Sequence, residues 1–434
     1  MDLVGVAPLL LVSCIAFLLI LIWRRQLSKG NLPPGPPPLP VLGNVLQLDL
    51  RNLVRSFWRV RDQYGPVFTI YLGSRPVVVL CGYEAIKEAL IDNAEVFGGR
   101  GSTMALDEKR RKFGIITTNG ERWRQLRRFS LTTLRNFGMG KRSIEERIQE
   151  EAQFLVEAVR KTEGCPFDPT FYLSHAVSNV ICSVVFGKRF DYDDKEFVTL
   201  LVLINKSIQI AFSFWSQERQ NPASEFHDDN LVVTVVNLFF AGTETVSTTL
   251  RYGLLLLLRY PEIEAKIQQE IDQVVGRNRS PCMEDRSRMP YTDAVVHEIQ
   301  RFVDLIPLGV PHSVIRDTVF RGYTIPKGTS IFPMLTSALN DPQHFETPRK
   351  FNPGHFLDEN GAFKKNEAFL PFSTGKRVCL GEGLARMELF LFMATLLQNF
   401  SLRTLKSPEE INILPQALSS GNLPRPYQLC MVPR

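Results

Sequence analysis

The start of the chain is a predominantly apolar segment. From Leu3 to Trp23 no side chain is charged, and a helix of this length would span a bilayer. Arg24 and Arg25 follow directly, so the positive-inside rule predicts a single-pass anchor over residues 1–23 with the rest of the chain in the cytosol. A cleaved signal peptide is the alternative, but the apolar run is too long for one and no basic segment precedes it.

Further along, apolar positions recur with helical spacing. Segment 143–164 starts with a capping-box pattern and stops at a glycine. Segment 229–259 is apolar nearly all round, but its insertion AGTETVSTT favours the protein interior over a second membrane span. Four segments predict helices in this way: 119–137, 143–164, 229–259 and 289–302.

Strand signals are fewer and shorter, and they are limited to VFTIYL, PVVVLCG and VFRGYTIP. Together, the helix and strand signals predict a mainly α fold with a small β part. Residues 24–44 are basic and then proline-rich, with five prolines among the six residues of 33–38. Such a run forbids helix and predicts a stiff hinge between the anchor and a folded domain over 45–434.

Composition narrows the class of protein. The 434 residues are 44% hydrophobic and 22% charged, which indicates a globular chain with a large core. A net charge of +6 is mild for this length and does not indicate nucleic-acid binding, for which no platform of basic and aromatic residues is present either. The seven cysteines are scattered without a CxxC pair, as expected for reduced thiols in the cytosol.

One cysteine lies in an unusual setting, the segment FSTGKRVCLG. Cys379 follows Lys376 and Arg377, lies between Gly375 and Gly381, and precedes an apolar helical run. The glycines permit a turn and a close approach, and the start of a helix would stabilise a thiolate. A thiolate on a single loop suits an axial position on heme iron. By chemistry alone, a metal ligand or nucleophile and an inert core residue stay equally open.

The same loop carries a resemblance to a known family. Phe372, Gly375, Arg377, Cys379 and Gly381 match the pattern FxxGxRxCxG. With this pattern the segment resembles the heme-binding loop of the cytochrome P-450 family, the heme-thiolate monooxygenases.

Three further segments carry the resemblance over nearly the whole chain. HEIQR, with Glu298 and Arg301, is similar to the family's ExxR helix, AGTET at 241–245 to its oxygen-activation helix, and PPGP at 33–36 to its hinge after the anchor. The likeness is strongest to the vertebrate microsomal members of family two, which act on drugs and steroids. The resemblance therefore implies the cytochrome P-450 fold.

For the cofactor, the resemblance implies heme b (iron protoporphyrin IX) with the thiolate of Cys379 as axial ligand, which favours cleavage of the O–O bond. Guanidinium and indole groups suit the heme propionates, although each such residue alone would also fit a solvated surface. The positions that match propionate-binding residues are Arg100, Trp123, Arg127, His312 and Arg377.

The resemblance also implies roles on two helices. Ala241 would lie beside the heme, while Thr245 and Glu244 would deliver protons to dioxygen. Without the resemblance, Thr245 fits a residue bonded back to its own helix. Gly242 costs about 1 kcal/mol in a helix interior and predicts a local distortion there.

On the ExxR helix, Glu298 and Arg301 are one turn apart and by themselves form an ordinary helical ion pair. The resemblance implies that His355, from FNPGHF, joins them in a structural lock behind the cysteine loop.

Electrons must come from a partner, because the chain has no nucleotide-binding glycine motif. The resemblance implies NADPH-cytochrome P-450 reductase, with cytochrome b5 as a second donor, at the endoplasmic reticulum membrane, and small lipophilic substrates such as xenobiotics, steroids or fatty acids. A basic cluster could meet an acidic reductase or could be an ordinary solvated face: Arg122, Arg124, Arg128, Arg135, Lys141 and Arg142.

The resemblance breaks between about residues 213 and 218. Relatives carry roughly sixty further residues there, which form the lid loop and two helices, and the flanks here stay in frame. Helices that cover on the order of 1,000 Å² contribute roughly 25 kcal/mol of gross burial, whereas net stability is only about 5–15 kcal/mol. We therefore expect helix 229–259 to be partly uncovered and turnover to be weak or absent.

Two rival interpretations stay open. The first is an inactive or poorly folded variant of such an enzyme. The second is a heme-thiolate isomerase that needs no reductase, although the intact acid and alcohol of AGTET favour oxygen activation.

Overall fold

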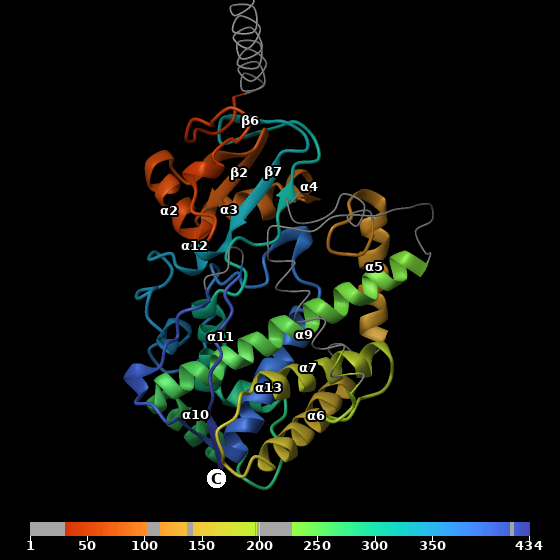
Figure 1. Ribbon diagram of the computed structural model, residues 1–434, viewed down its shortest axis with the longest axis vertical. Helices are drawn as coiled ribbons and strands as arrows, with labels where there is room; N and C mark the ends of the chain where they lie inside the picture. The colour runs from red at the N-terminus through yellow and green to blue at the C-terminus, as the bar shows by residue number, and fades with distance from the viewer. Residues whose placement is uncertain are drawn as a thin grey trace, which may run out of the picture. The chain divides into compact units, whose positions relative to one another are not determined.

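The computed structural model describes residues 31–101, 113–136, 142–195, 197, 199, 228–416 and 421–434. The chain divides into two compact units, which we call the sheet unit (up to residue 102, and 308–334) and the helical unit (103–307 and 335–434) (Figure 1). The predicted anchor, residues 1–23, lies outside the described residues. Among the described helices, none has the length and apolar character needed to cross a bilayer.

The sheet unit contains a five-stranded sheet in the order β1-β2-β7-β4-β3. The pairs β1/β2, β4/β7 and β3/β4 are antiparallel, and β2/β7 is parallel. A separate hairpin joins β5 and β6. The strands are β1 Val67–Leu72, β2 Arg75–Cys81, β3 Gly99–Arg100, β4 His312–Ser313, β5 Thr318–Phe320, β6 Tyr323–Ile325 and β7 Ser330–Met334, and the helices are α2 Leu53–Tyr64, α3 Tyr83–Lys87 and α4 Ala94–Phe97.

One face of this sheet is covered by α2. Phe57 of α2 is fully buried and meets Phe68 of β1 edge-on, with 6.1 Å between the ring centroids. On β2, Val77 and Val79 belong to the same apolar cluster, as expected for alternate residues that point to one face of a strand.

The proline-rich hinge is docked on the sheet unit. The Thr69 amide of β1 donates to the carbonyl of Pro34 at 2.9 Å, and the Asn44 side chain donates to the carbonyl of Pro36 at 3.0 Å. A Cβ on Gly35 would lie 1.8 Å from the Thr69 carbonyl oxygen, so only glycine permits this approach. Residues 33–38 belong to no helix or strand, and they are docked against β1.

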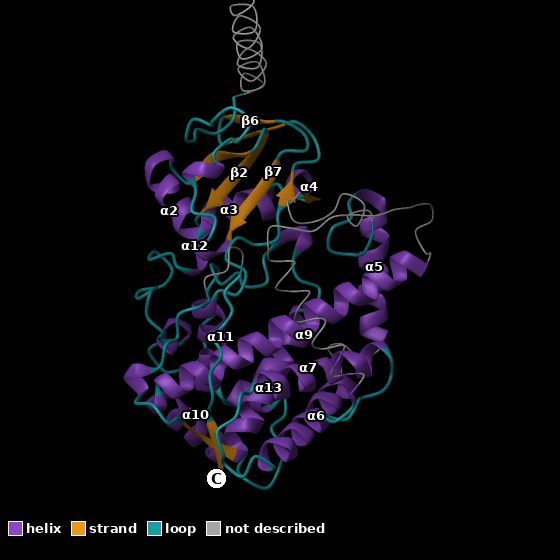
Figure 2. Cartoon of the chain, viewed as in Figure 1, coloured by secondary structure: helices purple, strands orange, loops and turns teal. Residues whose placement is uncertain are grey.

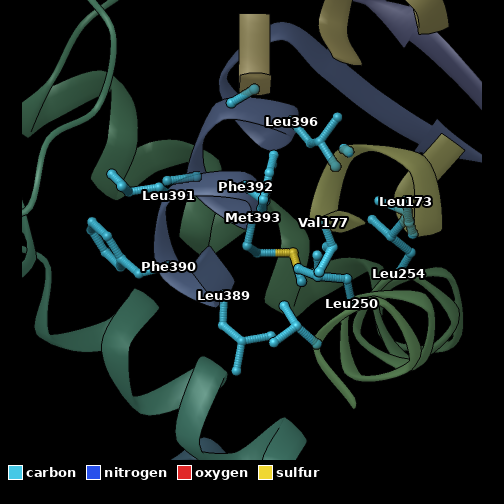
Figure 3. Close-up of a cluster of buried hydrophobic side chains, with 14 of the residues drawn as sticks. Leu173, Val177, Leu250, Leu254, Leu389, Phe390, Leu391, Phe392, Met393 and Leu396 are labelled. Atoms are coloured by element: carbon cyan, nitrogen blue, oxygen red, sulfur yellow. The ribbon is translucent and has the colours of Figure 1, made fainter. Parts of the chain in front are cut away.

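The helical unit surrounds one central helix (Figure 2). Helix α13 is buried nearly all round and contacts α6, α9, α10 and α11. In Figure 3, Met393 of α13 points between Val177 of α7 and Leu250 of α9. The elements are α5 Gly120–Asn136, α6 Arg142–Arg160, α7 Thr170–Val185, α9 Asp228–Arg259, α10 Pro261–Val274, α11 Pro290–Val303, α12 Leu335–Leu339, α13 Glu382–Asn399 and the antiparallel strands β8 Phe400–Arg403 and β9 Cys430–Pro433.

The distortion predicted at Gly242 does not interrupt α9, which runs through this residue as one continuous helix. Close packing gives a further physical reason for this glycine. A Cβ at this position would lie 2.6 Å from Cδ1 of Ile181 on α7, so its absence lets the two helices pack closely.

Candidate active site

The segment before α13 is a closed loop that presents Cys379. The Cys379 amide donates to the carbonyl of Phe372 at 3.0 Å, and the Val378 amide donates to the carbonyl of Gly375 at 3.1 Å. Gly375 has φ +71°, in the left-handed region that favours glycine. Because α13 begins at Glu382, the loop holds the cysteine just before the helix.

The Cys379 side chain is exposed, whereas Cys81, Cys182 and Cys430 are buried. Desolvation by the surrounding protein raises the pKa of the Cys379 thiol, and the backbone N–H of Gly381 opposes this increase. The carboxylate of Glu382 raises this pKa further, and the guanidinium of Arg127 lowers it. The loop therefore leaves the sulfur exposed, with Arg127 and the start of α13 as the groups that favour a thiolate.

Two guanidinium groups and an indole lie beside this loop. The Arg377 Cζ is 3.8 Å from the Trp123 ring centroid, and the Arg127 Cζ is 5.7 Å from it. Arg127 donates to the carbonyl of Val378 at 2.8 Å, and Arg377 donates to the carbonyl of Thr118 at 2.9 Å. Helix α5 and the cysteine loop thus bring Trp123, Arg127 and Arg377 together next to Cys379.

These side chains fit a heme. An exposed sulfur with backbone donors suits an iron ligand, and neighbouring guanidinium groups suit the carboxylates at the edge of a porphyrin. No group of three or more metal-ligating side chains occurs within the part of the chain that the structure describes.

On α9, Glu244 is a buried carboxyl with only one oxygen paired. The Thr248 hydroxyl donates to Oε1 at 3.0 Å, whereas Oε2 has no hydrogen-bond partner among the described residues. Burial raises the pKa of Glu244, and Arg251 opposes the increase. The site therefore favours a carboxyl group that retains its proton.

The Thr245 hydroxyl donates to the carbonyl of Ala241 at 2.6 Å. This is the back-bond that a helical threonine forms without any special role. Ala241 itself is exposed. Thr245 and Glu244 are neighbours in sequence, but their hydrogen bonds go to different partners on the same helix.

Glu298, Arg301 and His355 form one buried network. Arg301 binds Glu298 through two bonds of 2.7 Å, and Nδ1 of His355 lies 3.2 Å from Glu298 Oε2. Arg301 also donates to the carbonyls of Leu339, Pro348 and Lys350. The network therefore ties α11 to the segments that follow α12.

Arg100 and His312 belong to the sheet unit. They face each other across β3 and β4. Nδ1 of His312 donates to the carbonyl of Phe97 at 2.9 Å, and Arg100 donates to the carbonyl of Val310 at 3.0 Å. The short strands thus place a guanidinium and an imidazole side by side.

Sequence reasoning missed a second polar cluster beside the cysteine loop. Arg386 bonds both Glu382 and His297, and His297 bonds Asp293. Glu382 and Arg386 are four residues apart, and this spacing alone would have predicted a helical ion pair. No sequence pattern connects this pair with His297, because that contact joins two helices.

The family model described as Cytochrome P450 matches residues 33–218 and 213–431. The chain belongs to the cytochrome P450 family. Among its relatives, Cytochrome P450 2B4 of Oryctolagus cuniculus is 52% identical over 98% of this chain and 99% of the relative. Cytochrome P450 2G1 of the same organism is 51% identical over 100% of both chains, and Cytochrome P450 2C8 of Homo sapiens is 51% identical over 98% and 99%.

The comparisons confirm the predicted family, the mainly α fold and the shortening. The two matches of the family model meet at 213–218, where the resemblance breaks. The alignment with Cytochrome P450 2G1 spans 494 positions, so at least 60 of them (494 minus 434) have no residue from this chain. As a cytochrome P450, the protein is a monooxygenase whose cofactor is heme with an axial cysteine thiolate.

Proposed function

We propose that Cys379 is the axial ligand of heme b and that the chain inserts one atom of dioxygen into small lipophilic substrates. The observation that carries this proposal is the exposed Cys379 sulfur, which lies on a closed loop just before the first turn of α13. Cys430 is the rival thiol, but it is only 9% exposed and lies within the ladder of β8 and β9.

The residues beside the loop would hold the heme. Trp123, Arg127 and Arg377 would bind and orient the propionates through N–H donors. The family resemblance adds Arg100 and His312 of the sheet unit to this set. The bound heme supplies the activation of dioxygen, for which an axial thiolate favours O–O cleavage.

Proton delivery would fall to α9. Burial raises the pKa of Glu244, which favours the protonated form that a general acid needs. The Thr245 hydroxyl would pass the proton on after release from the Ala241 carbonyl. Ala241, which has no large side chain, would leave room for the heme face.

The Glu298–Arg301–His355 network would support the loop from behind. Arg301 has no exposed surface, and each of its bonds goes to the protein, so it has no role toward a substrate. Its proposed role is to fix the segments after α12, from which the chain leads on to the cysteine loop.

The electron donor would be NADPH-cytochrome P-450 reductase, with cytochrome b5 as a second donor. Arg124, Arg128 and Phe129 are exposed on α5, and such a basic surface suits an acidic partner. Arg135, Lys141 and Arg142 of the predicted cluster have side chains outside the described residues. The proposed location is the endoplasmic reticulum membrane, with the catalytic domain in the cytosol.

A second candidate is a shortened variant with little or no turnover. The N-terminal half of α9 is partly uncovered, since Val236 is 57% exposed, whereas residues 250–258 are buried. The residues that the relatives carry and this chain lacks would have covered part of a substrate pocket. We propose weak turnover for this reason, together with an intact heme site.

Expression of the full chain in membranes tests both candidates. A ferrous-carbonyl band of the thiolate type that disappears in Cys379→Ala and persists in Cys430→Ala would support the heme site. A thiolate band that persists in Cys379→Ala would overturn it. Product formation that depends on NADPH and reductase, and that rises when the missing segment is restored from a relative, would support the proposed effect of the shortening.

A further inference from the structure

Arg386 connects two helices next to the cysteine loop. Its Nε lies 3.0 Å and its Nη2 2.9 Å from Oε1 of Glu382, one turn earlier on α13. Its Nη1 lies 2.7 Å from Nε2 of His297 on α11. A guanidinium has donors only, so Nε2 of His297 accepts and the ring proton is on Nδ1. That nitrogen donates to the carbonyl of Asp293 at 2.7 Å.

The imidazole is held in this orientation from all sides. His297 is 5% exposed, and its ring centroid lies 5.4, 4.6 and 5.0 Å from those of Phe356, Phe363 and Phe369. The Asp293 carboxylate lies 3.2 Å from Nδ1 and is itself bound by Arg286 at 2.9 Å. Packing and hydrogen bonds thus leave Nε2 fixed as an acceptor toward Arg386.

Arg386 touches both ends of the segment that carries Cys379. Its Cζ stands 5.1 Å from the ring of Phe372, whose carbonyl accepts the Cys379 amide. Its carboxylate partner, Glu382, is the first residue of α13, and a Cβ built on the preceding Gly381 would lie 3.8 Å from the Cys379 sulfur. One side chain therefore braces the residues before and after the thiol.

We propose that His297 and Arg386 are positioning residues that hold the start of α13 and the Phe372 end of the loop, so that backbone N–H groups stay directed at the sulfur of Cys379. This inference rests on the proposed function, because it takes Cys379 as the heme ligand. His297 acts only through Arg386, and Arg386 acts through Glu382 and Phe372.

The test uses variants of the full chain that separate packing from hydrogen bonding. His297→Phe keeps a ring among Phe356, Phe363 and Phe369 but offers no acceptor. His297→Gln restores an acceptor oxygen. Arg386→Met removes both bonds, and Arg386→Lys retains a single donor centre. Arg277→Met is the matched control, because Arg277 pairs with Asp272 on an exposed surface.

The first readout is amide hydrogen exchange over residues 379–386, which needs no heme. Arg386→Met removes hydrogen bonds of a charged group, so we expect exchange in this variant to be about ten-fold faster or more. His297→Phe and Arg386→Lys should be several-fold faster. His297→Gln and the Arg277→Met control should remain within about two-fold of the parent.

The second readout is the ferrous-carbonyl spectrum of the heme-loaded chain. His297→Phe should increase the fraction with a thiol-type band, and His297→Gln should restore the thiolate-type band. Parental exchange rates and spectra in folded His297→Phe and Arg386→Lys would overturn the inference, even if Arg386→Met did not fold. A parent chain without any thiolate band would instead contradict the proposed function, while the exchange rates would still decide the positioning role.

Discussion

Two buried glutamates on neighbouring helices have opposite surroundings. Glu298 on α11 is bound at both oxygens, by Arg301, by His355 and by the amide of Asn352. Glu244 on α9 has one hydroxyl donor at one oxygen and no described donor at the other. The first arrangement is built around a carboxylate and its counter-charge, while the second favours a neutral carboxyl.

The contrast indicates a structural role for Glu298 and a catalytic role for Glu244. A buried ion pair with every polar atom satisfied has no spare lone pair or proton to exchange. A buried carboxyl with an unpaired oxygen costs stability, and residues of this kind cluster at functional sites. We therefore expect changes at Glu298 and Arg301 to affect folding, and changes at Glu244 to affect turnover.

The largest effect is expected for Arg301→Met. This change leaves the Glu298 carboxylate buried without its main partner and strips donors from three carbonyls. Breaking a buried pair costs about 3–5 kcal/mol, a large share of the stability of any domain. Urea denaturation followed by circular dichroism measures the loss.

Arg277→Met provides the comparison for that measurement, since its exposed pair with Asp272 should contribute less than about 1 kcal/mol. Equal losses in the two variants would contradict the structural role of the buried network.

The next effect concerns the packing of the helix that carries Glu244. Gly242→Ala places a methyl group 2.6 Å from Cδ1 of Ile181, and overpacking of this kind costs about 1–3 kcal/mol. Ile181→Val removes that atom, so the double variant should be less destabilised than the sum of the two single changes. Additive losses in urea denaturation would show that the helices do not meet at this point.

Local patterns predicted much of the fold. VFTIYL became β1 over the predicted residues, and α9 and α11 lie within one residue of their predicted bounds, because strand alternation and helical spacing depend on the chain alone. The unusual setting of Cys379 was also visible in the sequence, since its glycines and cations are adjacent, although chemistry alone left a metal ligand or nucleophile and an inert core residue equally open.

Contacts between distant segments could not be predicted from the sequence. The close approach of Ile181 to Gly242 depends on where α7 packs, and a glycine in a helix gives no sign of its neighbour. In the same way, His297 and Arg386 are 89 residues apart. Without the family resemblance, Glu298 and Arg301 would have remained an ordinary ion pair, because their burial comes from segments much later in the chain.

Glu244→Gln should affect folding less than Arg301→Met or Gly242→Ala does, but it should lower turnover directly. The amide keeps the shape and an acceptor for Thr248 but cannot supply a proton. Loss of a general acid costs up to 10²–10⁴-fold, and we expect roughly a 10- to 100-fold decrease in product formed per NADPH consumed. The measurement uses reductase in membranes, with this chain or with one that carries a relative's missing segment.

Glu157→Gln is the control for that assay, because Glu157 is exposed on α6. An unchanged yield in Glu244→Gln would remove Glu244 from proton delivery and leave only its cost to stability.

The smallest effect is a pH dependence of stability that comes from Glu244. Burial raises the pKa of Glu244, so the folded protein keeps this proton to a higher pH than the unfolded chain does. Its contribution to stability is complete below the ordinary carboxyl pKa and is lost as pH rises through the folded value. Glu244→Gln cannot ionise, so its stability relative to the parent should increase with pH in urea denaturation series, by at most about 1.4 kcal/mol per pH unit. If the difference in stability between Glu244→Gln and the parent stays constant from acidic to alkaline pH, Glu244 ionises in the folded protein as it does in the unfolded chain. Glu244 and Glu298 would then differ only in their hydrogen bonds.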